Sequence, residues 1–483
     1  MTADGVTATP PRAAPPAAGI ARNAGAQLTT FALRAASSVA LLATLGHLRG
    51  PQAVGAYTYA LQLTTMLTFV AGLGLQNLVV RETSRAPQST RAWVDLATGL
   101  LLASGAATVL TSLLLATVIP HDDARTVLAV GLAAVGLVGQ TLGALLAGAY
   151  YARERMGVET KATLVAEGGF LLAGTAVLTS GGSFLGLVAA YAGSRLVLPL
   201  TLLRSYLRDV GPIHPTVSLD RARPLLRRTV PFCLDDLLTA TYVRVDVTLV
   251  QVLRGTREVG LYTSATLLTL TLNILARVLN WSLYPRLSRT AGTAEFRTTV
   301  RMSVRLLLLV GFPLAVGPFL LGSQVMDLLW GDRFSSALDC YLLLTLVVPI
   351  RFLGHTTGTA LTAADHQSWR TWCVGGAALL NVGLNCWLIP TRGFYGAGIA
   401  TVVTEIALTT TYSLLLLRLI GPFCRTGDVL RPLAACVPMA LVLLTVRDSA
   451  PFALSVVAGT LVYAGSALAL RAVSLSELRE GTR

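Results

Sequence analysis

The sequence predicts an all-α polytopic membrane protein with about 14 transmembrane helices. We expect these helices to form two pseudo-symmetric six-helix lobes, followed by two C-terminal helices. Composition, the spacing of apolar blocks and an internal repeat carry this prediction. Of the 483 residues, 53% are hydrophobic and only 13% are charged, whereas soluble domains carry about 25% charged residues. A soluble chain this apolar would expose large sticky patches, so the excess is expected to face lipid.

The apolar residues are gathered in blocks of roughly 15–25 residues, close to the ~20 that cross ~30 Å of hydrocarbon as a helix. A block inside the membrane must be helical, because every backbone N–H and C=O needs an internal partner. The expected spans cover residues 25–46, 57–80, 92–119, 126–150, 160–181, 184–207, 229–253, 258–285, 300–322, 335–362, 369–390, 394–420, 429–447 and 451–472.

The distribution of basic residues predicts the orientation. If loops are assigned alternately from a cytoplasmic N-terminus, the inner set holds 26 Lys and Arg residues and the outer set holds 7. This bias follows the positive-inside rule, so both termini are expected in the cytoplasm and the number of spans is even. The net charge of +14 therefore sets topology and does not indicate nucleic-acid binding. Five arginines remain inside spans: Arg34, Arg195, Arg244, Arg277 and Arg351.

Span positions and composition divide the chain. The Pro/Ala-rich start lacks the pattern of a cleavable signal peptide and is expected to be disordered. The predicted segments are a cytoplasmic N-terminus (1–21), an N-lobe with spans one to six (22–207), a basic cytoplasmic linker (208–228), a C-lobe with spans seven to twelve (229–420), spans thirteen and fourteen (421–472) and a cytoplasmic tail (473–483). The scattered cysteines and histidines show no metal-binding spacing, and no cofactor or catalytic residue is expected.

An internal repeat relates the two halves. RGPQAVGAYTYALQLTTML (49–67) and RGTREVGLYTSATLLTLTL (254–272) align without gaps and share an Arg-Gly…Val-Gly-x-Tyr-Thr pattern. A repeat every six spans keeps its orientation, so the lobes should be related by a pseudo-two-fold axis along the membrane normal. Such lobes around a central cavity are typical of alternating-access transporters. The repeated glycines Gly50, Gly55, Gly255 and Gly260 are interpreted as tight outer turns.

Polar residues line three of the expected spans at helical spacing. The stripes are Gln27, Thr30, Arg34 and Ser37 in span one; Asp235, Thr239, Tyr242 and Asp246 in span seven; and Thr266, Thr269, Asn273, Arg277 and Asn280 in span eight. A charge at the bilayer centre costs about 2.5–3.5 kcal/mol on insertion scales and usually faces protein or water. The stripes therefore predict a wet cavity between the lobes. Arg34 and Arg277, with Asn273, Asn280 and Gln27, are the candidate site for an anionic group, because Arg binds phosphate with paired hydrogen bonds.

The other intramembrane charges have two interpretations. Asp235 and Asp246 could pair with the cavity arginines or bind a coupling cation, and Arg244 should point away from Asp246. Arg195, Arg351, Glu167 and Glu405 are more simply explained as structural ion pairs, although Glu405 is also a candidate for ion coupling.

Several stretches resemble the polysaccharide transporter (oligosaccharide flippase) branch of the multidrug/oligosaccharidyl-lipid/polysaccharide (MOP) flippase superfamily. They include GPQAVGAYTYA (50–60), GLGLQNLVVRETSR (72–85), VPFCLDDLLTATYVRVDVTLV (230–250) and NVGLNCWLIPTRGFYGAGIATVVTE (381–405). The resemblance implies export of a polyprenyl-(pyro)phosphate-linked oligosaccharide, with Arg34 and Arg277 contacting its anionic headgroup. It also implies a place in the bacterial cytoplasmic membrane, beside membrane lipids and the glycan polymerase and glycosyltransferases of the same pathway.

Two transport alternatives remain open. The cargo could be lipid II, or the chain could be an ion-coupled exporter of small molecules that uses Asp235 or Asp246. Superfamily relatives that export cationic drugs carry an acidic residue in span one, whereas span one here carries Arg34. A membrane glycosyltransferase or polymerase would need a large extramembrane catalytic segment, and no segment between the expected spans much exceeds about 20 residues. The sequence therefore favours a transporter over an enzyme.

Overall fold

The computed structural model describes the backbone of residues 17–119, 124–153, 155–216, 237, 242 and 244–472, and side chains from residue 29 onward except those of Phe31 and Trp281. The first group of helices comprises α1 (Ala17–Met66), α2 (Thr68–Gly72), α3 (Leu75–Arg85), η1 (Pro87–Ser89), α4 (Thr90–Val118), α5 (Arg125–Tyr151), α6 (Gly157–Thr179) and α7 (Phe184–Asp209). The second comprises α9 (Thr256–Thr290), α10 (Phe296–Leu320), α11 (Gly322–Trp330), η2 (Asp332–Ala337), α12 (Leu338–Thr345), α13 (Val348–Ala363), α14 (Gln367–Ile420), α15 (Thr426–Val446) and α16 (Phe452–Ala469).

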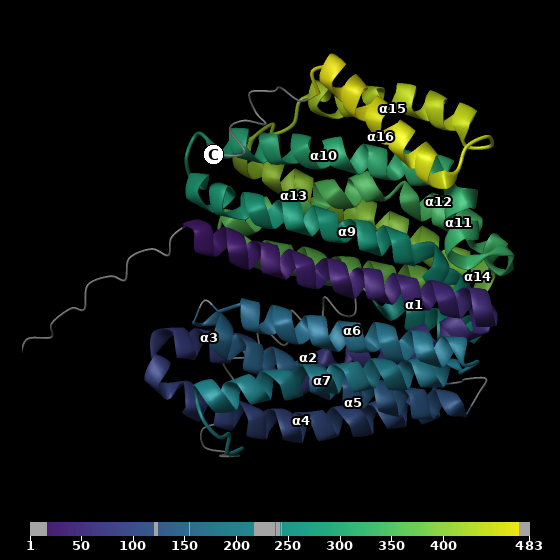
Figure 1. Cartoon of the computed structure of the whole chain (residues 1–483). Coiled ribbons are helices and arrows are strands. Elements are labelled where there is room, and N and C mark those ends of the chain that lie inside the picture. The colour runs from purple at the N-terminus through teal and green to yellow at the C-terminus, as the bar shows by residue number, and fades with distance from the viewer. Residues whose placement is uncertain are drawn as a thin grey trace, which may run out of the picture.

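The long helices lie roughly side by side in two layers (Figure 1). One layer holds α2 to α7, the other holds α9 to α16, and α1 runs between them against both α6 and α9. Every element in the described ranges is helical, which confirms the predicted all-α membrane fold. Nine of these helices are long and apolar enough to cross a membrane, and two bent helix pairs also qualify.

Two of the helices are too long to be single spans. At 1.5 Å per residue, the 50 residues of α1 extend about 75 Å, more than twice the thickness of the hydrocarbon core. Gly50 breaks α1 with φ 75° and ψ −170°, and Gly393 breaks the 54-residue α14 with φ 59° and ψ −147°. Each glycine therefore joins two expected spans. The seventh expected span is helical over residues 244–254, and most of its remainder lies outside the described residues.

Other expected spans contain breaks that hydropathy did not predict. The second span is made of the end of α1, then α2 and α3, and bends by 44°. Leu73 and Gly74 have φ values of 47° and 66° between α2 and α3, a conformation that cannot continue a right-handed helix. The tenth span bends by 41° between α12 and α13. The short helix α11 lies where only a loop was expected.

The repeated glycines divide into two kinds. Gly50 and Gly255 have positive φ values of 75° and 86°, and they form turns as predicted. Gly55 and Gly260 lie inside α1 and α9, so the prediction of turns at these two positions is wrong. We call the side of the bundle that carries Gly50, Gly255 and Gly393 the Gly50 end.

The final helix pair is held to the second group at the opposite end. Arg301 of α10 donates from Nε to Asp428 Oδ2 at 2.6 Å and from Nη2 to Oδ1 at 2.9 Å. The backbone N–H of Arg425 also bonds Asp428 Oδ2, at 2.9 Å. Because the Asp428 side chain is only 4% exposed, this paired bond is protected from solvent.

We expect Arg301→Ala to destabilise the protein by about 1.5–3 kcal/mol, because the buried Asp428 carboxylate would lose a charged donor. Thermal unfolding of the detergent-solubilised protein would measure the change. Arg289→Ala is the matched control, since the exposed Arg289 bonds only the Pro285 carbonyl of its own helix among its described contacts. Equal unfolding temperatures for the two variants would contradict the prediction.

Candidate functional site

Three charged residues meet between α1, α6 and α7. Glu167 of α6 is fully buried, and its Oε1 lies 2.7 Å from Nη1 of Arg195 on α7. The same oxygen lies 3.5 Å from Nε of Arg34 on α1. Arg34 Nη2 also donates to the Thr163 hydroxyl at 3.3 Å, and the Arg195 guanidinium stacks 4.6 Å from the centre of the Tyr191 ring. One carboxylate is therefore shared by two guanidinium groups.

The cluster keeps an excess positive charge, and that charge is accessible at Arg34. The side chain of Arg195 is 5% exposed, whereas that of Arg34 is 30% exposed. Thr30 and Ser37, which share the predicted stripe with Arg34, are buried. The side chain of Gln27 lies outside the described residues. Among the described side chains of the stripe in span one, that of Arg34 is therefore the one that can contact a ligand while α1 keeps its packing.

The stripe predicted for span eight runs along α9, and its side chains differ in exposure. Thr269 is buried, Asn273 is half-buried and Arg277 is exposed. Asn280 is buried and donates to the Ala276 carbonyl at 2.9 Å. The side-chain oxygens of Asn273 and Asn280 have no hydrogen-bond donor among the described residues. Arg277 therefore lies beside amide groups that can accept hydrogen bonds.

The charges of the seventh span point in two directions. Tyr262 of α9 donates its hydroxyl proton to Asp246, and that hydroxyl lies 3.2 Å from the Thr401 hydroxyl on α14. Arg244 instead donates to the amide oxygen of Gln62 on α1. The two side chains do not pair with each other, which agrees with their spacing of two residues. The third candidate on this span, Asp235, lies outside the described residues.

Arg351 and Glu405 form a separate ion pair at 2.7 Å between α13 and α14, with both side chains 13% exposed. Sequence reasoning identified these charges but not their partners. It also missed the role of Tyr262, although the repeat places a tyrosine at both Tyr57 and Tyr262. The repeat marks the tyrosine, but the contact of its hydroxyl with Asp246 could be found only from the structure.

The two groups of helices contact each other on the side of the Gly50 end. Gln62 and Met66 at the end of α1 contact Arg244 and Thr248. Along α9, Ser264 is 1% exposed and Thr269 is 2% exposed, whereas Leu270 and Leu275 are 39% and 41% exposed. Arg34 lies 16 residues from Gly50 and Arg277 lies 22 residues from Gly255, whereas the contacting residues Gln62 and Arg244 lie 12 residues from Gly50 and 11 from Gly255. The candidate anion site is therefore on the side of the interface away from the Gly50 end.

An apolar groove of about 430 Å³ lies between α4, α5 and α7, and Leu102, Leu142 and Leu200 are among its lining residues. Its lining residues are all apolar. Gly139 in the groove packs on the backbone carbonyl of Arg195, so α7 separates the groove from the Arg34–Glu167–Arg195 cluster. An anionic headgroup would find no partner in this groove.

The fold is that of the MOP-superfamily transporters. It is similar to the solved structure of the lipid II flippase MurJ in an inward closed conformation, with a TM-score of 0.78 and 12% identity over 92% of this chain and 98% of that one. An inward-facing multidrug resistance MATE family transporter matches with a TM-score of 0.65 and 16% identity, over 80% of this chain and 94% of that one. A MOP superfamily transporter from Pyrococcus furiosus matches with a TM-score of 0.54 and 14% identity, over 84% and 96%.

A family profile described as polysaccharide biosynthesis protein matches residues 45–339. The chain belongs to this polysaccharide biosynthesis protein family. No curated protein sequence gives a significant match. The described residues include helices long and apolar enough to cross a membrane, which agrees with this fold.

Proposed function

We propose that this protein moves a polyprenyl-(pyro)phosphate-linked oligosaccharide across the bacterial cytoplasmic membrane by alternating access. In this proposal Arg34 and Arg277 contact the anionic headgroup, with Asn273, Asn280 and Gln27 around it. The glycan would then be available for assembly of a cell-surface polysaccharide.

One observation carries the proposal. The two helices at the interface, α1 and α9, each carry an arginine with exposed side-chain surface, and both arginines lie farther along their helices from Gly50 and Gly255 than the Gln62–Arg244 contact does. Arg34 belongs to a cluster with two guanidinium groups and one carboxylate, so the site favours a ligand with negative charge. Paired hydrogen bonds from guanidinium groups suit the oxygens of a phosphate or pyrophosphate. The amide oxygens of Asn273 and Asn280 are buried here, and they would accept hydrogen bonds from sugar hydroxyls in a state that exposes this face of α9.

The charge bias of the loops supports the direction of transport. With both termini in the cytoplasm, the Gly50 end is the outer face. Arg34 and Arg277 then lie on the cytoplasmic side of the Gln62–Arg244 contact, where a lipid-linked glycan is presented for export. An inward-facing state of an alternating-access cycle would expose them to that side.

Reconstitution into liposomes tests the proposal. A fluorescent polyprenyl-pyrophosphate sugar would be placed in both leaflets, and a membrane-impermeant quencher would report the fraction that exchanges between them. We expect exchange only in liposomes that contain the protein. Lipid II in a parallel assay distinguishes the cargo, since preferential movement of lipid II would assign the alternative substrate. No movement of either lipid beside an active control flippase would reject the proposal.

An ion-coupled small-molecule exporter is the second candidate, favoured by the half-buried carboxylate of Asp246. Its contacts with Tyr262 and the backbone N–H of Val247 place it where a cation or proton could compete. This candidate predicts that overexpression raises growth resistance to cationic dyes, and that Asp246→Asn removes this resistance. Resistance that does not change on overexpression would count against it.

A further inference from the structure

The two copies of the internal repeat meet each other in space. A Cβ atom built on Gly55 of α1 would lie 1.9 Å from the backbone oxygen of Thr256. A Cβ atom built on Gly260 of α9 would lie 1.9 Å from the backbone oxygen of Pro51. Gly55 and Gly260 are equivalent positions of the repeat, and so are Pro51 and Thr256. The contact is therefore reciprocal, as a pseudo-two-fold axis between the lobes requires.

Each crossing segment is fastened to its own lobe by the arginine that opens the repeat. Arg49 donates to the carbonyl of Gly181, between α6 and α7. Arg254 donates from Nε to the Ile389 carbonyl at 3.0 Å and from Nη2 to the Pro390 carbonyl at 2.8 Å, just before the kink in α14. Each arginine thus bonds the end of the fifth expected span of its own lobe. This span is α6 in the first lobe and the part of α14 before Gly393 in the second. Any movement of a lobe would carry its crossing segment with it.

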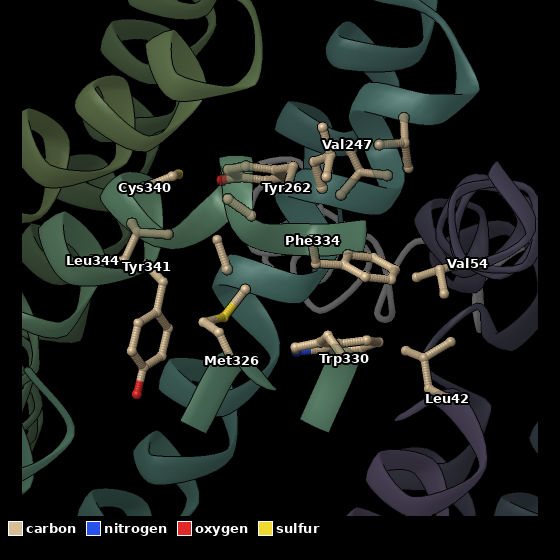
Figure 2. Packing of buried hydrophobic residues seen from close by; sticks show 14 of the residues in the cluster. Leu42, Val54, Val247, Tyr262, Met326, Trp330, Phe334, Cys340, Tyr341 and Leu344 are labelled. Atoms are coloured by element: carbon tan, nitrogen blue, oxygen red, sulfur yellow. The ribbon is translucent and has the colours of Figure 1, made fainter. Parts of the chain in front are cut away.

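Aromatic packing extends the contact at the Gly50 end. Figure 2 shows Trp330 and Phe334 pointing toward Leu42 and Val54 of α1. The two aromatic rings lie 5.2 Å apart and both are buried. A Cβ atom on Gly46 would lie 2.8 Å from the Trp330 ring, so α1 also packs closely on this aromatic pair.

We infer that the two copies of the repeat form the outer gate, with Gly55 and Gly260 as the gating residues. Glycine lets two backbones approach without interlocking side chains, so the gate closes tightly and can separate as two rigid surfaces. The contacts of Gln62 with Arg244 and of Met66 with Thr248 lie on the arginine-site side of this crossing. The inference rests on the proposed alternating access but not on the identity of the cargo.

A single methyl group should force this gate open. The atoms that oppose Gly55 and Gly260 are backbone oxygens, which cannot rotate away as a side chain can. We expect Gly55→Ala and Gly260→Ala each to shift the protein toward the outward-open state. Gly169→Ala is the matched control, because a Cβ atom there has nothing within 4 Å.

The readout is labelling of Ser264→Cys by a membrane-impermeant maleimide added from outside, in a chain whose six natural cysteines have been replaced. Ser264 lies one helical turn from Gly260 on the same face and is 1% exposed. We expect slow labelling in the parent and in Gly169→Ala, and labelling at least several-fold faster in the two gate variants. Equal rates in folded, membrane-inserted variants would overturn the inference. Because no cargo is present, this result is independent of the flipping assay.

A second measurement leaves both glycines intact. His47 Nε2 lies 3.0 Å from the Leu328 carbonyl across the same end, and both residues are exposed. Cysteines at these two positions, joined by a short bismaleimide, should hold the gate shut and stop transport. The double variant without the cross-linker serves as the control. Undiminished transport of the fluorescent lipid after complete cross-linking would overturn the inference.

Discussion

Replacing Arg34 and Arg277 together with alanine is expected to reduce movement of the fluorescent polyprenyl-pyrophosphate sugar by more than a hundredfold. A hydrogen bond to a charged group contributes about 1.5–3 kcal/mol, which corresponds to roughly tenfold to hundredfold in affinity for each arginine. Each single variant should therefore retain weak transport, and the double variant should retain almost none. Initial rates in liposomes with matched protein content measure the effect.

Three control variants separate recognition from folding. Arg34→Lys and Arg277→Lys keep the positive charge but lose the paired geometry of guanidinium, so intermediate rates are expected. Arg392→Ala removes an exposed arginine near the Gly50 end and should transport like the parent. Full transport by the folded double variant would show that the headgroup binds elsewhere.

Glu167→Gln is expected to have the largest effect on stability. The carboxylate is fully buried and lies within 4 Å of both Arg195 and Arg34. Its neutralisation leaves Arg195 as a buried cation without an opposite charge, and breaking a buried ion pair in this way costs about 3–5 kcal/mol. We expect little folded protein in the membrane and early unfolding on heating in detergent.

The compensating double variant gives the decisive comparison. Glu167→Gln with Arg195→Gln removes both buried charges, and its stability should be closer to the parent than that of Glu167→Gln alone. Arg155→Ala is the control, because its ion pair with Asp209 at 2.9 Å is exposed and such pairs contribute about 0–1 kcal/mol. Equal stability of the parent and Glu167→Gln would mean that the cluster does not hold the lobe together.

The fold class could be predicted from the sequence because lipid imposes a simple rule. Long apolar blocks must be helices, and the charge bias and the repeat then indicate orientation and two equivalent halves. The repeat also marked Gly50 and Gly255, whose positive φ values only glycine adopts readily. The predicted lobe limits and the assigned roles of Arg34 and Arg277 remain predictions.

The structure adds what depends on contacts between distant segments. Hydropathy cannot show the break at Leu73 and Gly74, since it does not report the backbone dihedral angles that end α2 there. Periodicity placed Arg34 and Thr30 on one face but could not show that this face meets Glu167 of α6. Gly55 and Gly260 were interpreted as turns because glycine has two uses, and only the neighbouring backbone distinguishes a turn from a close crossing.

The turns at Gly50 and Gly393 affect how the chain inserts into the membrane during its synthesis. Gly50, with a positive φ, joins the two helical segments of α1, and Gly393, also with a positive φ, joins the two helical segments of α14. No hydrophilic loop therefore needs to be carried through the membrane between these segments. Each pair can then enter the bilayer as a unit during synthesis. Arg49 can bond the segment between α6 and α7 when that segment emerges later, whereas Arg254 is already in place when α14 emerges.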